Sequence, residues 1–277
     1  MKTLALSLTI ALLGGAALAG ERWESDALAA LRNSDSKTAM RIAQDHAGAK
    51  HATIILFAAN AQQYDRSQHS KSLSRAKALY KELLNDVAVD DAPILHALRT
   101  MTGSVLPSYS ETLMDQALQR VRTSAEVRAV PDALAVVYKS ERYKVFGALS
   151  GWLSAQRAQL AQGRGLDADT RAAIADERLI TALLDAMPAG KSAAPSAPVV
   201  LASPRPGLVG PPAGTAQRDG GRLPPRTNAT ARECLVLIEE PAMDYVTARL
   251  TDLGDDGLSL LSDMCTAKNL RESMARK

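Results

Sequence analysis

The chain has few residues of the kinds that usually carry chemistry. Among its 277 residues there are 2 cysteines and 4 histidines, and aromatic residues make up 4%. The scarcity of aromatic residues disfavours a sheet, because strands are enriched in aromatic and β-branched side chains. His46 and His51 lie on either side of Gly48 at a spacing that zinc sites do not use, so we predict no metal site.

Recognisable catalytic motifs are also missing. The sequence contains no nucleophile elbow, Ser-x-x-Lys, His-Glu-x-x-His, phosphate-binding loop or dinucleotide fingerprint. Its acidic residues are spread along predicted helical faces, where solvated charge is their normal role, so no general acid stands out. We therefore predict no catalytic residue and no cofactor. The net charge of +3 is small for a chain of this length and gives no general attraction for nucleic acid.

The amino-terminal segment is the clearest feature that is present. Lys2 precedes an apolar run from Leu4 to Leu13, and the small residues Ala17 and Ala19 follow at the spacing that a signal peptidase accepts. The apolar run is too short to span a bilayer. We predict that residues 1–19 are a signal peptide cleaved between Ala19 and Gly20, and that the mature protein is periplasmic or secreted.

Residues 20–187 have the pattern of an all-α domain. Alanine and leucine supply most of the apolar side chains, and apolar residues recur at helical spacing between short polar turns. The segment 49–63 is apolar almost all round, so we expect a central helix there, followed by a polar loop over 65–71. Pro131 is expected to be the first residue of a longer helix that continues to about Gln162, because proline is favoured at the first helical position.

The composition changes abruptly after residue 187. Residues 188–229 are rich in proline, glycine and alanine, and we predict a disordered linker because such a segment buries too little apolar surface to fold. An excess of basic side chains would let this linker contact an anionic membrane surface; the charged residues are Lys191, Arg205, Arg218, Arg222 and Arg226, against Asp219. Residues 230–277 then have the pattern of a small helical module.

Both cysteines, Cys234 and Cys265, fall in this C-terminal module. An even number of cysteines in an oxidising compartment predicts a disulfide between them. A bridge that closes about 30 residues would stabilise the module by roughly 3.5 kcal/mol. The two residues can meet only if the helical segment after Cys234 breaks at Pro241.

A spacing of 37 residues separates Ala39, Ala76 and Leu113, and each is followed four positions later by another residue suited to a core. Equal spacing of this length is produced by stacked helical hairpins, since each pair buries its face against the next. An irregular helical bundle is the alternative architecture.

Residues 52–86 carry the best of these units. The stretch Ser74-Arg75-Ala76-Lys77-Ala78-Leu79-Tyr80-Lys81 resembles the second helix of a tetratricopeptide or Sel1-like repeat, and the resemblance extends loosely over residues 21–123. It implies a helical hairpin array, or α-solenoid, with a groove that holds peptides. The candidate partner-binding residues in such a groove are Tyr64, Tyr80 and Tyr109.

These observations favour an exported, non-catalytic adaptor or scaffold that binds a protein or peptide partner in the cell envelope. One alternative is a cell-wall enzyme or accessory factor acting on peptidoglycan, which would need a buried glutamate in a cleft. Another is a protein that binds anionic lipid or an envelope polymer through its basic linker. The sequence indicates no particular partner and no oligomeric state.

Overall fold

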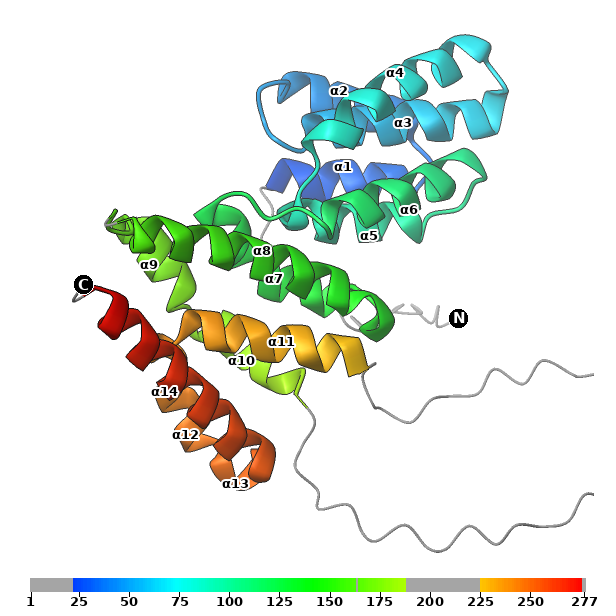
Figure 1. Cartoon of the computed structure of the whole chain (residues 1–277). Helices are drawn as coiled ribbons and strands as arrows, with labels where there is room; N and C mark the ends of the chain where they lie inside the picture. Colours follow the sequence, from blue (N-terminus) through cyan, green and yellow to red (C-terminus); the bar gives the residue numbers. More distant parts are fainter. Residues whose placement is uncertain (1–21, 163, 188–224, 276–277) are drawn as a thin grey trace, which may run out of the picture. The chain divides into compact units, whose positions relative to one another are not determined.

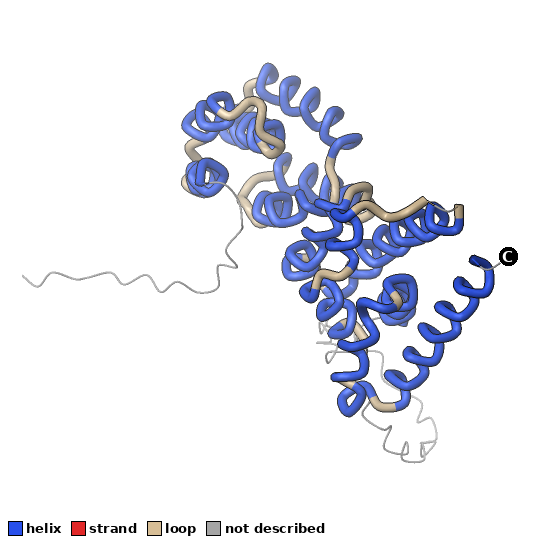
Figure 2. The backbone as a smooth tube through the Cα atoms, turned by 90° about the vertical axis from the view of Figure 1, so that its left-hand side faces the viewer, coloured by secondary structure: helices blue, strands red, loops and turns tan. Residues whose placement is uncertain are grey.

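The computed structural model of the chain describes residues 22–162, 164–187 and 225–275 (Figure 1). Within these ranges all regular structure is helical and no strand occurs, as Figure 2 shows. The predicted all-α fold is therefore confirmed. The predicted signal peptide lies outside the described residues, and so do residues 188–224 of the predicted linker.

Most helices are short and follow one another closely along the chain. In order, they are α1 (Arg22–Arg32), α2 (Ser36–Asp45), α3 (Ala52–Ser67), α4 (Ser70–Asp86), η1 (Val89–Asp91), α5 (Ala92–Arg99), α6 (Val105–Ala117), α7 (Ser124–Val136), η2 (Lys139–Glu141), α8 (Arg142–Ala161), α9 (Ala168–Ile174), α10 (Glu177–Asp185), α11 (Pro225–Ile238), α12 (Glu240–Ala248), α13 (Leu250–Leu253) and α14 (Asp255–Ala275). The two η elements are single turns of 3₁₀ helix.

The helices form two compact units, and the boundary between them falls inside the predicted domain 20–187. Unit 1 contains the described residues up to Val87 together with Pro93–Met114. Unit 2 contains Ala88–Ala92 and the described residues from Asp115 onward. The short segment 88–92 belongs to unit 2 because η1 packs against α7.

Unit 1 is built around α3, as its apolar sequence predicts. Ile55, Phe57 and Ala58 on this helix are fully buried, and α3 packs against both α2 and α4. The positions that share the 37-residue spacing, Ala39 on α2 and Ala76 on α4, are also fully buried. Small side chains at these positions let neighbouring helices pack closely, which suits a chain with few large aromatic residues.

The turn between α3 and α4 is shorter than the predicted loop over 65–71. Helix α3 continues to Ser67, Gln68 adopts a left-handed conformation with φ of 56°, and α4 begins at Ser70. Polarity at these positions reflects exposure at helix ends, so the prediction of a long loop was wrong.

Asp65 instead holds the start of α6. Its carboxylate accepts hydrogen bonds from the amide and hydroxyl of Ser104, at 3.2 and 2.8 Å, and from the amide of Val105 at 3.2 Å. Gly103 has φ of +140°, and a Cβ there would lie 2.5 Å from the Asp65 carboxylate. Asp65 therefore caps a helix that begins 40 positions later in the chain.

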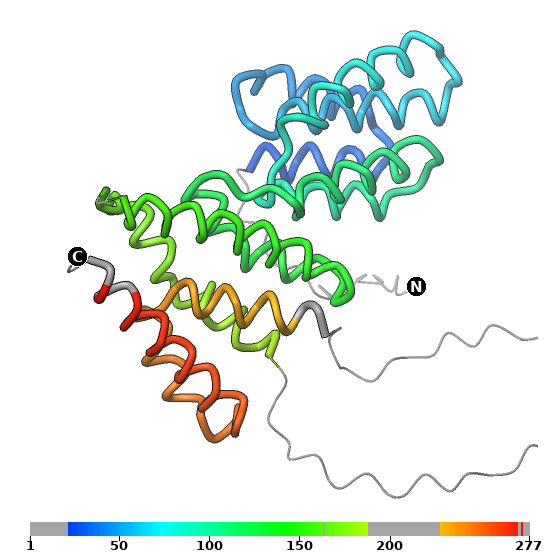
Figure 3. Tube along the Cα trace, viewed as in Figure 1, coloured from blue at the N-terminus to red at the C-terminus, as the bar shows by residue number. Residues whose placement is uncertain are grey.

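Unit 2 is built on the pairing of α8 with α11, which lie side by side in Figure 3. The buried face of α8 includes Phe146 and Leu149, and α11 covers α8 with Cys234, Leu235 and other buried residues. The Cys234 thiol donates a hydrogen bond to the Phe146 carbonyl oxygen at 3.4 Å. The apolar face of α8 is thus covered by a segment nearly ninety positions away.

This packing corrects two predicted boundaries. Residues 225–229, expected to end the linker, form the first part of α11. The segment 230–277, expected to be a separate small module, belongs instead to the same compact unit as residues 115–187. The reason is that α11 contributes its apolar face to the core around α8 rather than to a core of its own.

The predicted disulfide between Cys234 and Cys265 is wrong. Both cysteines are free, with Cys234 buried and Cys265 exposed on α14. Cys234 packs against α8 in the interior of unit 2, where its thiol donates a hydrogen bond to the Phe146 carbonyl oxygen. The chain nevertheless breaks where expected, since α11 ends at Ile238 and Pro241 lies in the first turn of α12.

Pro131 does not begin a helix, so that prediction was also wrong. Helix α7 begins earlier, where the Thr123 side chain accepts from the Glu126 amide and the Glu126 carboxylate accepts from the Thr123 amide. This reciprocal capping box fixes the start of the helix and leaves Pro131 in its interior. The chain then turns through η2 before α8 begins at Arg142.

Candidate functional site

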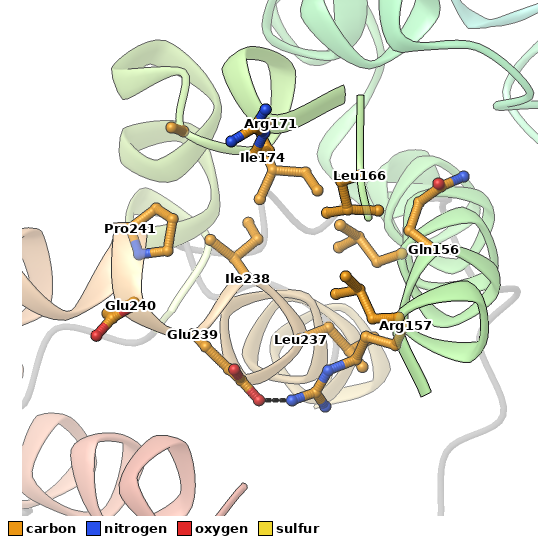
Figure 4. Close-up of a pocket in the computed structure, with 13 residues that line it drawn as sticks. Gln156, Arg157, Leu166, Arg171, Ile174, Leu237, Ile238, Glu239, Glu240 and Pro241 are labelled. Carbon is orange, nitrogen blue, oxygen red and sulfur yellow. Dashed lines mark ion pairs between the residues drawn. The ribbon is translucent and has the colours of Figure 1, made fainter. Parts of the chain in front are cut away.

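A pocket of about 280 Å³ lies in unit 2, between α8, α9 and the junction of α11 with α12 (Figure 4). Its lining is mainly aliphatic, and in Figure 4 the side chains of Leu166, Ile174 and Ile238 converge on it. The other large aliphatic residues of the lining are Leu153, Leu160 and Leu237. Ligand sites are typically concave and mostly apolar with a few polar groups, and this pocket fits that description.

Glu239 forms the corner between α11 and α12. Its amide donates to the Leu235 carbonyl oxygen at 3.1 Å, and its own carbonyl oxygen accepts from the Ala242 amide at 2.9 Å. The backbone at this corner has φ of 58° and ψ of −121°, a conformation that normally requires glycine. A strained non-glycine residue costs about 1–3 kcal/mol, and such residues concentrate at functional sites.

The Glu239 side chain is buried and forms an ion pair with Arg157 of α8, drawn as the dashed line in Figure 4. The exposed fraction of the Glu239 side chain is 4%, and that of Arg157 is 28%. Breaking a buried pair by removing one partner is strongly destabilising, because it leaves an uncompensated charge. The ion pair therefore fixes the α11–α12 corner against α8 and shapes this wall of the pocket.

Other charges at the pocket are also neutralised locally. Glu240 pairs with Lys268 of α14 at 2.6 Å. Beside the pocket, Asp167 caps α9, and hydrogen bonds from the amide and the hydroxyl of Thr170 hold the pKa of the Asp167 carboxyl below its ordinary value. That carboxylate is therefore directed at its own helix.

Arg171 is the exception among the four charged residues that line the pocket. It is exposed on α9, and within the described residues it has no ion-pair partner. Figure 4 shows it on the side of the pocket opposite the Arg157–Glu239 pair. The pocket thus combines an apolar interior, one internally paired wall and one available guanidinium group.

The three tyrosines singled out in the sequence all belong to unit 1. Tyr80 and Tyr109 stack with ring centroids 4.6 Å apart and an interplanar angle of 21°. The buried ring of Phe57 lies 6.2 Å from Tyr80 and 6.3 Å from Tyr109. Tyr64 is half-buried on α3 and has no ring contact with these three among the described residues. Two of the three predicted residues therefore come together, in a half-buried aromatic cluster.

Sequence reasoning missed Arg157, Arg171 and Glu239. The available signal was the apolar run from Leu235 to Ile238 followed directly by Glu239, Glu240 and Pro241, which marks a helix break beside a buried segment. A break identifies a corner in the chain. It does not reveal which helix lies across from it.

Two histidines have structural roles in unit 1. His46 stacks on Trp23 with ring centroids 4.7 Å apart, and the His51 Nδ1 atom lies 2.7 Å from the Glu24 carboxylate. Over the described ranges, no group of three or more His, Cys, Asp or Glu side chains could hold a metal ion. In the same part of the chain, no helix combines the length and the apolar character that crossing a bilayer requires.

Comparison of this chain with protein families, with curated proteins and with solved structures finds no match.

Proposed function

We propose that the protein is an exported, non-catalytic adaptor that binds a protein or peptide partner, with the pocket of unit 2 as the partner's binding site. The observation that carries this proposal is the apolar pocket itself, whose wall is held by a strained, buried, ion-paired glutamate. Export is supported by the signal-peptide pattern of residues 1–19.

The size of the pocket favours a side chain as its occupant. Its volume of about 280 Å³ is slightly below the range for small-molecule sites, which begins at about 300 Å³. A cavity of this size accepts one or two aliphatic side chains and does not accommodate an extended glycan. Interfaces depend on a few anchor residues that fill such apolar pockets, while the surrounding contacts contribute little.

One observation favours the cell-wall enzyme as a second candidate: Glu239 is a buried glutamate that lines a cavity. Its environment does not suit proton donation, however. The Arg157 guanidinium stabilises the charged carboxylate, whereas a general acid must carry a proton at the start of the reaction. Release of muropeptides by the purified protein, abolished in Glu239→Gln, would establish the enzymatic alternative.

The adaptor proposal is tested by blocking the pocket. Ala175 is an exposed lining residue just after α9, so Ala175→Trp fills the mouth without disturbing a buried side chain. We expect partner proteins recovered by in-cell crosslinking from wild type to be lost from this variant. Ala172→Trp is the matched control, because Ala172 is an exposed alanine on α9 that does not line the pocket.

Identical crosslinked partners in Ala175→Trp and wild type would contradict this assignment of the site. The aromatic cluster of unit 1 would then be the next surface to alter. Circular dichroism and thermal unfolding of both tryptophan variants should match wild type, since each replaces an exposed residue.

A further inference from the structure

Among the charged residues that line the pocket, the one that is not neutralised by an ion pair within the described residues is positive. Arg157 is paired with Glu239, and Glu240 is paired with Lys268. Arg171 is left as the lining residue with no ion-pair partner in the described ranges. A binding site with one available cation beside an apolar cavity favours an occupant that is apolar and carries one negative charge next to its apolar part.

We infer that the occupant is an internal segment of a partner protein in which an apolar residue is followed within a few positions by an acidic residue. This inference rests on the proposed function and adds the partner's chemistry. The apolar side chain enters the pocket between Ile174 and Ile238, and the acidic side chain pairs with Arg171. Arginine suits this role because its planar guanidinium donates two parallel hydrogen bonds to a carboxylate.

An acidic side chain fits this rim better than a terminal carboxylate does. Proteins usually capture a chain terminus with clustered backbone amides, whereas they bind acidic motifs with arginine side chains. The amides at the start of α9 are directed at Asp167, whose carboxylate accepts from Thr170 at 2.7 Å. Among the charged donors that line the pocket, Arg171 is the one without an ion-pair partner in the described ranges.

The neighbouring surface limits where the acidic residue can bind. Glu239 and Glu240 lie on the α11–α12 side, and Figure 4 places Arg171 across the pocket from the first of them. Both glutamates are already ion-paired, so the α11–α12 side offers no available cation among its described residues, whereas Arg171 on α9 attracts a carboxylate. The segment should therefore bind in one direction across the pocket.

The test is selection from a phage-displayed library of random twelve-residue peptides on the full mature chain. The wild type should enrich sequences in which an aliphatic or aromatic residue precedes Asp or Glu. A synthetic copy of the strongest peptide should then bind Arg171→Gln about tenfold more weakly than wild type, by fluorescence anisotropy, since loss of one charged partner costs about that factor. Arg171→Glu should select peptides with Lys or Arg in place of the acidic residue.

Arg164→Gln is the matched control, since Arg164 is an exposed arginine close to α9 that does not line the pocket. It should bind the peptide as wild type does. The terminal-carboxylate alternative is tested by amidating the peptide's C-terminus: unchanged affinity supports the internal motif, and a tenfold loss overturns it.

The outcomes separate this inference from the proposed function. Peptides that bind wild type but not Ala175→Trp, and that show no acidic preference or no dependence on Arg171, would retain the pocket as a peptide site and overturn the inferred motif. No selective enrichment on wild type, or equal enrichment on Ala175→Trp, would overturn the proposed site itself.

Discussion

The two units differ in how far apart in the sequence their packed helices lie. In unit 1, each of the first four helices packs against its neighbour in the chain, so α1 pairs with α2, α2 with α3 and α3 with α4. In unit 2, the largest packed pair joins α8 to α11, with two helices and residues 188–224 between them in sequence. Local periodicity therefore predicts unit 1 well, and it predicts unit 2 only as a set of separate helices.

The candidate site follows the same division. Every wall of the pocket is in unit 2, where residues 153–175 meet residues 237–241. Distant segments can bring together groups that no single helix presents, such as Arg157 and Glu239. The locally built unit 1 instead contains the Tyr80–Tyr109 stack, which comes from α4 and α6.

The difference between the two units is tested most directly by removing the C-terminal segment that contains α11. A chain that ends at Met187 loses α11 and exposes the apolar face of α8. Burial of each large apolar side chain contributes about 1.5–3 kcal/mol, so losing several approaches the 5–15 kcal/mol net stability of a typical domain. Unit 2 should therefore lose hydrogen-exchange protection over α7, α8 and α10, while α1–α4 of unit 1 keep theirs.

The same experiment contrasts the structure with the expected independent C-terminal module. If residues 230–277 folded separately, the truncated chain would keep protection throughout α8. Protection in α3 serves as the internal reference, since its partners α2 and α4 remain in the shortened chain.

A smaller effect is expected from the Asp65 side chain, which caps α6 of unit 1 across a long sequence distance. Asp65→Ala removes the acceptor for the amides of Ser104 and Val105 and should lower the free energy of unfolding by about 2 kcal/mol, measured in urea. Asp65→Asn keeps one side-chain oxygen and should lose less. A variant as stable as wild type would show that this cap does not stabilise unit 1.

The smallest effect concerns Cys234 of unit 2 and depends on pH. Burial raises the pKa of the Cys234 thiol, so the folded protein retains this proton at pH values where the unfolded chain has released it. The stability contributed by this group is complete below the ordinary cysteine pKa of 9.0 and decreases as the pH rises above it. The loss should reach about 1.4 kcal/mol by pH 10.

Urea unfolding between pH 8 and pH 10 measures this slope, and Cys234→Ala should remove it. Cys265→Ala is the matched control and should leave the slope unchanged, because Cys265 is exposed. In the native protein a thiol reagent should label Cys265 rapidly and Cys234 only on unfolding. Equal labelling rates would contradict the buried position of Cys234.

Several elements were predictable from sequence because their causes are local. The apolar run over 49–63 predicts a central helix, and α3 is that helix. The expected break near Pro241 is also found, with α11 ending at Ile238 and the chain turning at Glu239, since proline cannot continue a helix from the preceding turn. Tyr80 and Tyr109 were predicted to be partner-binding residues in a groove, and the structure shows them stacked and half-buried.

The errors have a common physical cause. The disulfide between Cys234 and Cys265 was predicted from the number of cysteines. In the structure, the Cys234 thiol instead donates a hydrogen bond to a carbonyl oxygen of α8. Pro131 was placed by an intrinsic preference that the capping box of Thr123 and Glu126 overrides. In each case the residues that determine the structure were not among those from which the prediction was made.

The sequence alone determined that this chain is helical and where several of its helices break, because helix propensity, apolar periodicity and proline stereochemistry act over a few residues. Only the tertiary structure decided which segments share a core, which cysteine is buried and where a pocket forms. Apolar burial does not depend on sequence distance, so a helix binds whichever apolar face is available. At the strained corner, Glu239 pairs with Arg157, which lies on a different helix and far away in the sequence.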